Sequence, residues 1–118
     1  MNLEEFQKHQ EDFFNNLLVV CRKKQAEYAA DGNAFHNFEN SAGFSMMNER
    51  ESAAWEFCVK HLQSVRDIIK SVEVGGEVHG YPTQELIDEK FGDIIVYMTL
   101  MHGMLTDRIN TYEESKKE

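Results

Sequence analysis

The stretch EKFGDIIVYMTLMHG, residues 89–103, places acidic side chains inside a long apolar run. Glu89, Asp93 and Tyr97 recur at intervals of four, which keeps them on one face of a helix because an α-helix turns once in about 3.6 residues. The residues around Asp93 have the composition of a protein core. An acid among core residues destabilises a fold unless it is paired. The sequence therefore predicts that Asp93 has a charged partner or a bound cation.

The composition is that of one folded domain, which we expect to span residues 1–118. Hydrophobic residues make up 42% of the chain and charged residues 28%, both ordinary values for globular proteins. Twelve basic against twenty-one acidic residues give a net charge of −9. This charge repels the phosphates of nucleic acids. Direct binding to a nucleic acid duplex is therefore not expected.

The location predicted from the sequence is the cytoplasm. The first ten residues are polar and acidic, and no apolar run approaches the ~18 residues that span a bilayer, so no membrane partner is expected. Cys21 and Cys58 lie in helical apolar patterns without the spacing of a metal site. They are predicted to be buried thiols.

The first half of the chain predicts one helix followed by a loop. Apolar residues recur at helical spacing from Leu3 to about Ala29, and Gly32 would supply the terminating conformation. Residues 33–48 have no sustained period and are rich in Asn, Ser and Gly. We expect an ordered loop there, which holds Phe35 and Phe38.

A second helix is predicted from a capping box of Asn48 and Glu51 to about Val72. Residues 73–83 contain three glycines and the only proline, which favours a polar connection or a small hairpin. The helical period of the second helix predicts a buried stripe formed by Trp55, Cys58, Val59, Leu62, Val65, Ile69 and Val72.

A third helix is predicted from Gln84, with Thr83 as its N-cap, to about Thr106 or Thr111. Residues 1–2 and 112–118 are expected to fray. The fold class is therefore all-α: a small bundle of three long helices with an ordered loop rich in Phe and Asn. Three helices with this much apolar surface favour a homo-oligomer.

Two kinds of partner would stabilise Asp93. In the first, Glu56, Glu89 and Asp93 hold a Mg²⁺ ion, since hard cations prefer carboxylate oxygens and helical bundles build such sites from facing helices. In the second, Asp93 forms a buried ion pair with Lys60, or next with Lys24, and Glu89 belongs to a solvated edge.

Three segments together resemble a known family. They are KKQAEYAADGNAFHNF (residues 23–38), VKHLQSVRDII (59–69) and DEKFGDIIVYMTLM (88–101). Their order resembles the nucleotide modification associated domain, type one, of phage and prophage proteins, and more distantly the all-α nucleoside triphosphate pyrophosphatases of the MazG and dimeric dUTPase kind. Two departures stand out: Val59 occupies the place of an acid, and the spacing from Glu89 to Asp93 is one residue longer than in MazG proteins.

The resemblance implies a MazG-like architecture and a nucleotide-binding protein, with Mg²⁺-dependent pyrophosphohydrolysis or a role in nucleotide modification as its finer forms. Asp93, Glu89 and Lys60 would then be catalytic, and Glu56, Glu89 and Asp93 would bind the metal. Phe35 and Phe38 would stack on the base, or else they anchor the loop to the core. The residues expected to contact the nucleotide are Lys24, Tyr28, Asn33, Phe35, Asn37, Phe38 and Tyr97.

Two functions without a small ligand compete with this one. The first is an acidic interaction or inhibitor protein of a phage that acts in the host cytoplasm. The net charge of −9 suggests it. The second is a structural helical oligomer, in which an ion pair of Lys60 with Asp93 serves the fold.

Overall fold

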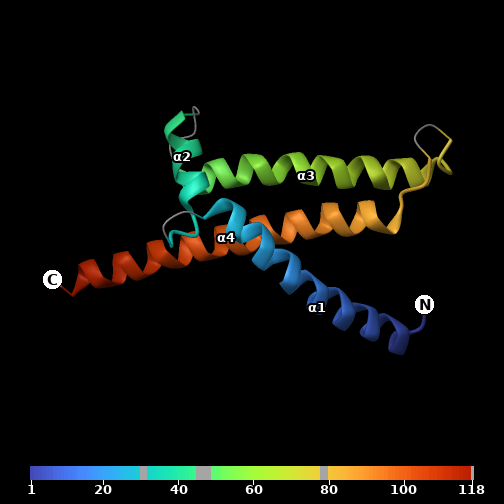
Figure 1. Cartoon of the computed structure of the whole chain (residues 1–118), viewed down its shortest axis with the longest axis horizontal. Coiled ribbons are helices and arrows are strands. Elements are labelled where there is room, and N and C mark those ends of the chain that lie inside the picture. The colour runs from blue at the N-terminus through green and yellow to red at the C-terminus, as the bar shows by residue number, and fades with distance from the viewer. Residues whose placement is uncertain (30–31, 45–48, 78–79, 118) are drawn as a thin grey trace.

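The computed structural model describes residues 1–29, 32–44, 49–77 and 80–117, and it describes only the backbone of Tyr28 and of residues 41–44. These segments form helices and no strand, so the all-α prediction is confirmed, with four helices in place of three. The helices are α1 (Leu3–Tyr28), α2 (His36–Phe44), α3 (Arg50–Glu73) and α4 (Gln84–Lys116) (Figure 1). None of the described helices is long and apolar enough to cross a membrane.

The helices α3 and α4 lie side by side and form the largest helix contact of the molecule (Figure 1). The short helix α2 packs on the first turns of α3. Helix α1 crosses α4 near the middle of the molecule, and its N-terminal half diverges from α4 (Figure 1). The molecule is therefore elongated, with extents of 58 × 36 × 26 Å.

Helix α1 begins with a capping box that the sequence analysis did not identify. The backbone N–H of Glu5 donates to Asn2 Oδ1 at 2.8 Å, and the backbone N–H of Asn2 donates to the Glu5 carboxylate at 3.2 Å. These contacts satisfy two of the N–H groups that a helix start leaves without partners. The helix ends at Tyr28, close to the predicted end, and Gly32 follows with a positive φ of 77°.

The prediction of a loop over residues 33–48 is wrong in its central part, where α2 forms. Asn33 Oδ1 accepts a hydrogen bond from the backbone N–H of Phe35 at 3.0 Å, and Asn33 Nδ2 donates to Glu39 at 3.0 Å. Asn33 thereby builds the turn that leads into the helix. Nine residues make fewer than three helical turns, too few for a periodic pattern to reveal.

Helix α3 covers the predicted range but begins without the predicted cap. Its N-cap is Glu49, whose side chain makes no capping hydrogen bond, and Asn48 lies outside the described residues. Glu51 pairs with Arg50 and Arg108.

The predicted buried stripe of α3 is largely wrong within a single chain. Cys58 is fully buried, and the side chains that join it in the interior are the small residues Ala53 and Ala54. Small residues let α3 approach α4 closely. Val59 and Val65 of the stripe are partly buried. Its other members retain 37–52% of their exposure, namely Trp55, Leu62, Ile69 and Val72.

The connection from α3 to α4 is a series of turns in its described part. Gly75 and Gly76 both have positive φ, and the hydroxyl of Ser71 donates to the carbonyl of Gly80 at 2.8 Å. The hairpin considered for this segment includes Val78, which lies outside the described residues.

Thr83 caps α4 as predicted, since its hydroxyl accepts the backbone N–H of Leu86 at 3.1 Å. The helix continues to Lys116, and the fraying expected at residues 1–2 and 112–118 stays a prediction.

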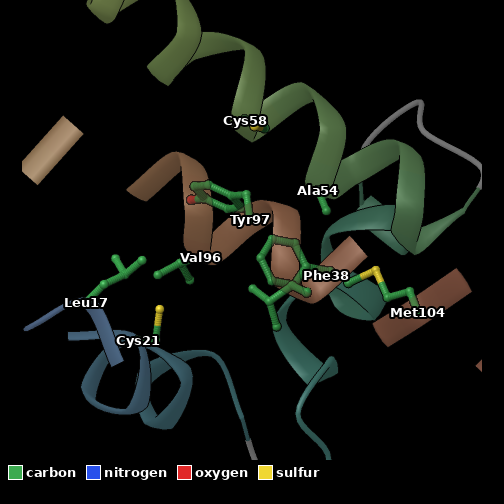
Figure 2. Close-up of a cluster of buried hydrophobic side chains, with 9 residues drawn as sticks. Leu17, Cys21, Phe38, Ala54, Cys58, Val96, Tyr97 and Met104 are labelled. Atoms are coloured by element: carbon green, nitrogen blue, oxygen red, sulfur yellow. The ribbon is translucent and has the colours of Figure 1, made fainter. Parts of the chain in front are cut away.

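The core lies where all four helices meet (Figure 2). Phe38 of α2 is 1% exposed and is packed between α3 and α4. The two cysteines are buried thiols as predicted, and burial raises the pKa of both. The buried hydrophobic cluster consists of Leu17, Cys21, Phe38, Ala54, Cys58, Val96, Tyr97, Leu100 and Met104.

Candidate functional site

The acid of the opening stretch points into the molecule, as the sequence predicted. Asp93 lies on α4 one turn before Tyr97 and beside Gly92, and all three residues are buried. Its side chain retains 8% of its exposure. A carboxylate in this position needs compensation within the fold.

Lys24 supplies that compensation, and a histidine from a further helix lies beside it. The ammonium of Lys24 on α1 lies 3.0 Å from Asp93 Oδ1, which is ion-pair distance. The Nδ1 atom of His61 on α3 lies 3.6 Å from Asp93 Oδ2, which is beyond the ordinary length of a hydrogen bond. Asp93 of α4 is thus in contact with a basic side chain of α1 and lies near a histidine of α3.

Aromatic rings pack behind this group. The His61 ring stacks on Tyr97 with centroids 5.3 Å apart and an interplanar angle of 27°. Tyr97 also stacks on Phe57 at 6.4 Å, and Phe38 meets both rings edge-on. Of these four rings, His61 is the one with a nitrogen 3.6 Å from Asp93, and its side chain is partly open to solvent, at 24% exposure.

Lys60, named first as a partner of Asp93, does not pair with it. The Lys60 ammonium lies 5.7 Å from the centre of the Phe57 ring, and the residue is exposed. Adjacent residues of a helix point about 100° apart, so only one of Lys60 and His61 can face α4. His61 takes that position, and Lys24, the second partner named, forms the ion pair.

The proposed metal ligands are not gathered around Asp93. Glu56 on α3 and Glu89 on α4 are both exposed. Across residues 1–29, 32–44, 49–77 and 80–117, no group of three or more His, Cys, Asp or Glu side chains could hold a metal ion. The residues therefore do not fit a Mg²⁺ site as they stand, because the Lys24 ammonium occupies one oxygen of Asp93.

The residues expected to contact a nucleotide divide between the interior and the surface. Phe38 is a core residue, and the Phe35 ring lies under the Arg50 guanidinium at 4.9 Å and is partly buried. Both rings thus anchor their segment to the core. This is the alternative that the sequence analysis set beside stacking on a base. Asn33 builds the turn before α2 and Asn37 is exposed. Lys24 and Tyr97 belong to the Asp93 group, and the side chain of Tyr28 lies outside the description.

His61 is the site residue that sequence reasoning missed. Its contact with Asp93 joins two helices that are far apart in the sequence, so no residue spacing reveals it. The only indication is its place beside Lys60 in the second of the three matching segments.

A second charged cluster, also missed, ties α2, α3 and α4 together. Arg108 binds Glu51 at 2.9 Å and Glu49 at 2.8 Å. Arg50 donates to Glu39 of α2 and to the carbonyl of Met104, each at 3.2 Å. The hydrogen bond from Arg108 is the main reason that the pKa of Glu51 falls from 4.5 to about 2. The guanidinium groups of Arg50 and Arg108 are paired with carboxylates of the same chain. We therefore assign this cluster a structural role.

Comparisons of the chain with protein-family models, with curated proteins and with solved structures gave no match. The family resemblance described from the sequence therefore remains a prediction. The chemistry of the Asp93 group has to be argued from its own atoms.

Proposed function

We propose that the chain binds a nucleotide at the group formed by Lys24, Asp93 and His61. The observation that supports the proposal is a buried carboxylate that positions two nitrogen groups, each from another helix and each partly open to solvent. The exposed fractions are 32% for the Lys24 side chain and 24% for the His61 side chain. A ligand can therefore reach both groups from outside.

A buried ion pair beside a histidine is not needed to pack three helices together. Replacing a buried ion pair by apolar side chains of similar volume is often neutral or stabilising, so such a pair is weak support for a purely structural role. Here the pair stands beside a histidine, whose charge is the most readily changed near neutral pH. A group of this kind suits ligand binding or proton transfer.

The ligand class comes from the chemistry of the donors together with the resemblance. An ammonium and an imidazole both donate hydrogen bonds to phosphate oxygens. Asp93 faces Nδ1 of His61, which directs the other ring nitrogen, Nε2, toward a ligand. In a hydrolytic form of the proposal, His61 would be neutral, and Nε2 would accept a proton from the attacking water in place of donating to a phosphate.

The competing proposal is that the Asp93 group only stabilises a structural helical protein. The 3.0 Å distance between Lys24 and Asp93 favours it, since a closed ion pair leaves less donor capacity for a ligand. The two proposals make opposite predictions about nucleotides.

Thermal unfolding with a panel of nucleoside mono-, di- and triphosphates, with and without Mg²⁺, separates them. We expect at least one nucleotide to raise the melting temperature above that with Mg²⁺ alone, because a ligand that binds only the folded state stabilises it. The Lys24→Met variant should lose this shift. Lys23→Met is the matched control, because Lys23 is an exposed neighbour with the same charge, and it should keep the shift.

His61→Gln provides a second variant that leaves the Lys24 ion pair intact, and it should weaken the nucleotide-dependent shift. If no nucleotide stabilises the wild-type protein beyond Mg²⁺ alone, nucleotide binding is wrong and the structural role is favoured.

A further inference from the structure

Helix α1 exposes most of its apolar side chains in the single chain. Leu17 and Cys21 are its buried residues, whereas Phe14 retains 60% of its exposure and Leu18 retains 53%. Isolated helices gain little stability from propensity in water and depend on packing of an apolar face. A second surface that covered this part of α1 would therefore stabilise it.

An apolar groove lies between the N-terminal half of α1 and the first turns of α4, where the two helices diverge (Figure 1). It encloses about 470 Å³. Phe14 and Phe91 stand at its edges with 60% and 42% exposure. Its apolar lining consists of Phe6, Phe13, Phe14, Ile87 and Phe91.

The exposed surface area of the chain shows how much area a second copy could cover. The chain exposes 8862 Å², whereas a compact monomer of 13.7 kDa exposes about 6,600 Å². The radius of gyration is 17.7 Å, against about 13.5 Å for a compact chain of this length. The excess of about 2,300 Å² exceeds the ~800 Å² that each partner buries in a standard interface. One chain therefore carries enough excess surface for a stable dimer.

The charges on α1 are arranged for pairing with an antiparallel copy of itself. Residues 3–14 carry four acids and one lysine, and residues 15–28 carry one acid and three basic residues, of which Lys24 is paired with Asp93 and the other two are exposed. An antiparallel copy places the acidic half of each helix against the basic half of the other. Such complementarity determines the register and orientation of an interface.

We propose that α1 of a second copy packs antiparallel on α1 and in the groove beside α4, so that the protein is a two-fold symmetric dimer. Phe14 and Leu18 are one turn apart, and in a two-fold arrangement each Phe14 contacts the partner's Leu18. Glu11 and Arg22 lie on the same edge of α1 because eleven residues make about three turns. Each Glu11 then faces the partner's Arg22. This interface does not depend on nucleotide binding.

Sedimentation equilibrium of the full chain tests the dimer. We expect the wild-type protein to have twice the 13.7 kDa mass of one chain at micromolar concentration. Phe14→Glu should raise the dissociation constant at least about a hundredfold, because it places charges at the centre of the interface. Val19→Glu is the control: Val19 is 71% exposed but lies about 140° around the helix from Phe14, so the dimer should persist.

Charge reversal tests the antiparallel register. Glu11→Arg alone and Arg22→Glu alone should each raise the dissociation constant about tenfold, since each reversal changes two symmetric contacts. The double variant should regain wild-type affinity, and an equimolar mixture of the two single variants should form mixed dimers.

A wild-type protein that stays monomeric at every concentration would overturn the dimer, and another partner would then have to cover α1. Dimers that tolerate Phe14→Glu, or a double variant that dimerises no better than the singles, would overturn the proposed surface.

Discussion

At the scale of single residues, the buried carboxylate of Asp93 and its partners are the feature on which the proposed function depends. Its burial could be predicted because apolar residues surround it in the sequence, whereas Glu89, at the start of the run, is exposed. The partners of Asp93 could not be predicted, because the choice among Lys24, Lys60 and His61 depends on how α1 crosses α4 and on which residue of α3 faces inward. Those are properties of the packed helices, and no spacing within one segment encodes them.

The Asp93 ion pair makes an asymmetric prediction for stability. Lys24→Met leaves the buried carboxylate without its ammonium, whereas Asp93→Asn leaves a lysine that can turn toward solvent. Breaking a buried pair costs about 3–5 kcal/mol, and the partial exposure of Lys24 reduces this to roughly 2–3 kcal/mol for Lys24→Met. Asp93→Asn should cost less.

Urea denaturation of both single variants and the double variant measures this coupling. The double variant should be less destabilised than the sum of the singles, and Lys23→Met should change stability by less than about 0.5 kcal/mol. Additive effects of the two single changes would show that Lys24 and Asp93 do not interact.

Glu51 makes a prediction about acid stability. Hydrogen bonds from Arg108 lower its pKa in the folded state to about 2, below its ordinary value of 4.5. A depressed pKa contributes stability that is complete above the unfolded value and is lost as pH falls toward the folded value. We therefore expect the free energy of unfolding to fall between pH 4.5 and pH 2, and to fall less steeply in Glu51→Gln. Glu56→Gln, an exposed change on the same helix, should keep the wild-type slope.

At the scale of elements, the three long helices follow from periodicity, with a correctly predicted cap only at Thr83, and α2 does not follow from it. Thr83 could be identified as a cap because it precedes a long apolar period. The nine residues of α2 are too few to show one. The face that α3 buries was also not predictable from its pattern. The period finds the apolar stripe of Trp55, Leu62 and Ile69, whereas α4 packs on the small residues Ala54 and Cys58.

The turn after α3 provides a matched pair of glycines. Gly75 and Gly76 have φ of +70° and +74°, so an alanine at either position costs about 1–2 kcal/mol in backbone strain. At Gly76 a methyl group would also lie 2.9 Å from the Tyr81 ring and 3.0 Å from the backbone of Gly80, whereas Gly75 faces open space. We expect Gly76→Ala to be the more destabilising by about 1–3 kcal/mol in urea denaturation. Equal effects would contradict this packing.

At the scale of the whole molecule, the elongated shape and the exposed apolar face of α1 belong together. The all-α class could be predicted and is confirmed, whereas self-association stays a prediction from the amount of apolar sequence. The surface that we propose for it could not be found from the sequence, since it depends on the divergence of α1 from α4 (Figure 1).

A dimer makes the melting temperature depend on protein concentration. When unfolding is coupled to dissociation, its equilibrium depends on protein concentration by mass action. The wild-type melting temperature should therefore rise as the concentration increases from about 1 to about 100 μM. The Phe14→Glu variant should melt at a temperature that does not depend on concentration. A wild-type protein with a concentration-independent melting temperature would contradict the dimer.

A nucleotide site formed by Lys24, Asp93 and His61 is tested most directly by nuclear magnetic resonance of the histidine side chains. The signals of His61, assigned with His61→Gln, should shift and saturate as a nucleotide is added in the presence of Mg²⁺. The same titration of Lys24→Met should leave them in place. Histidine signals that do not respond to any nucleotide at millimolar concentration in the wild-type protein would contradict the proposed site.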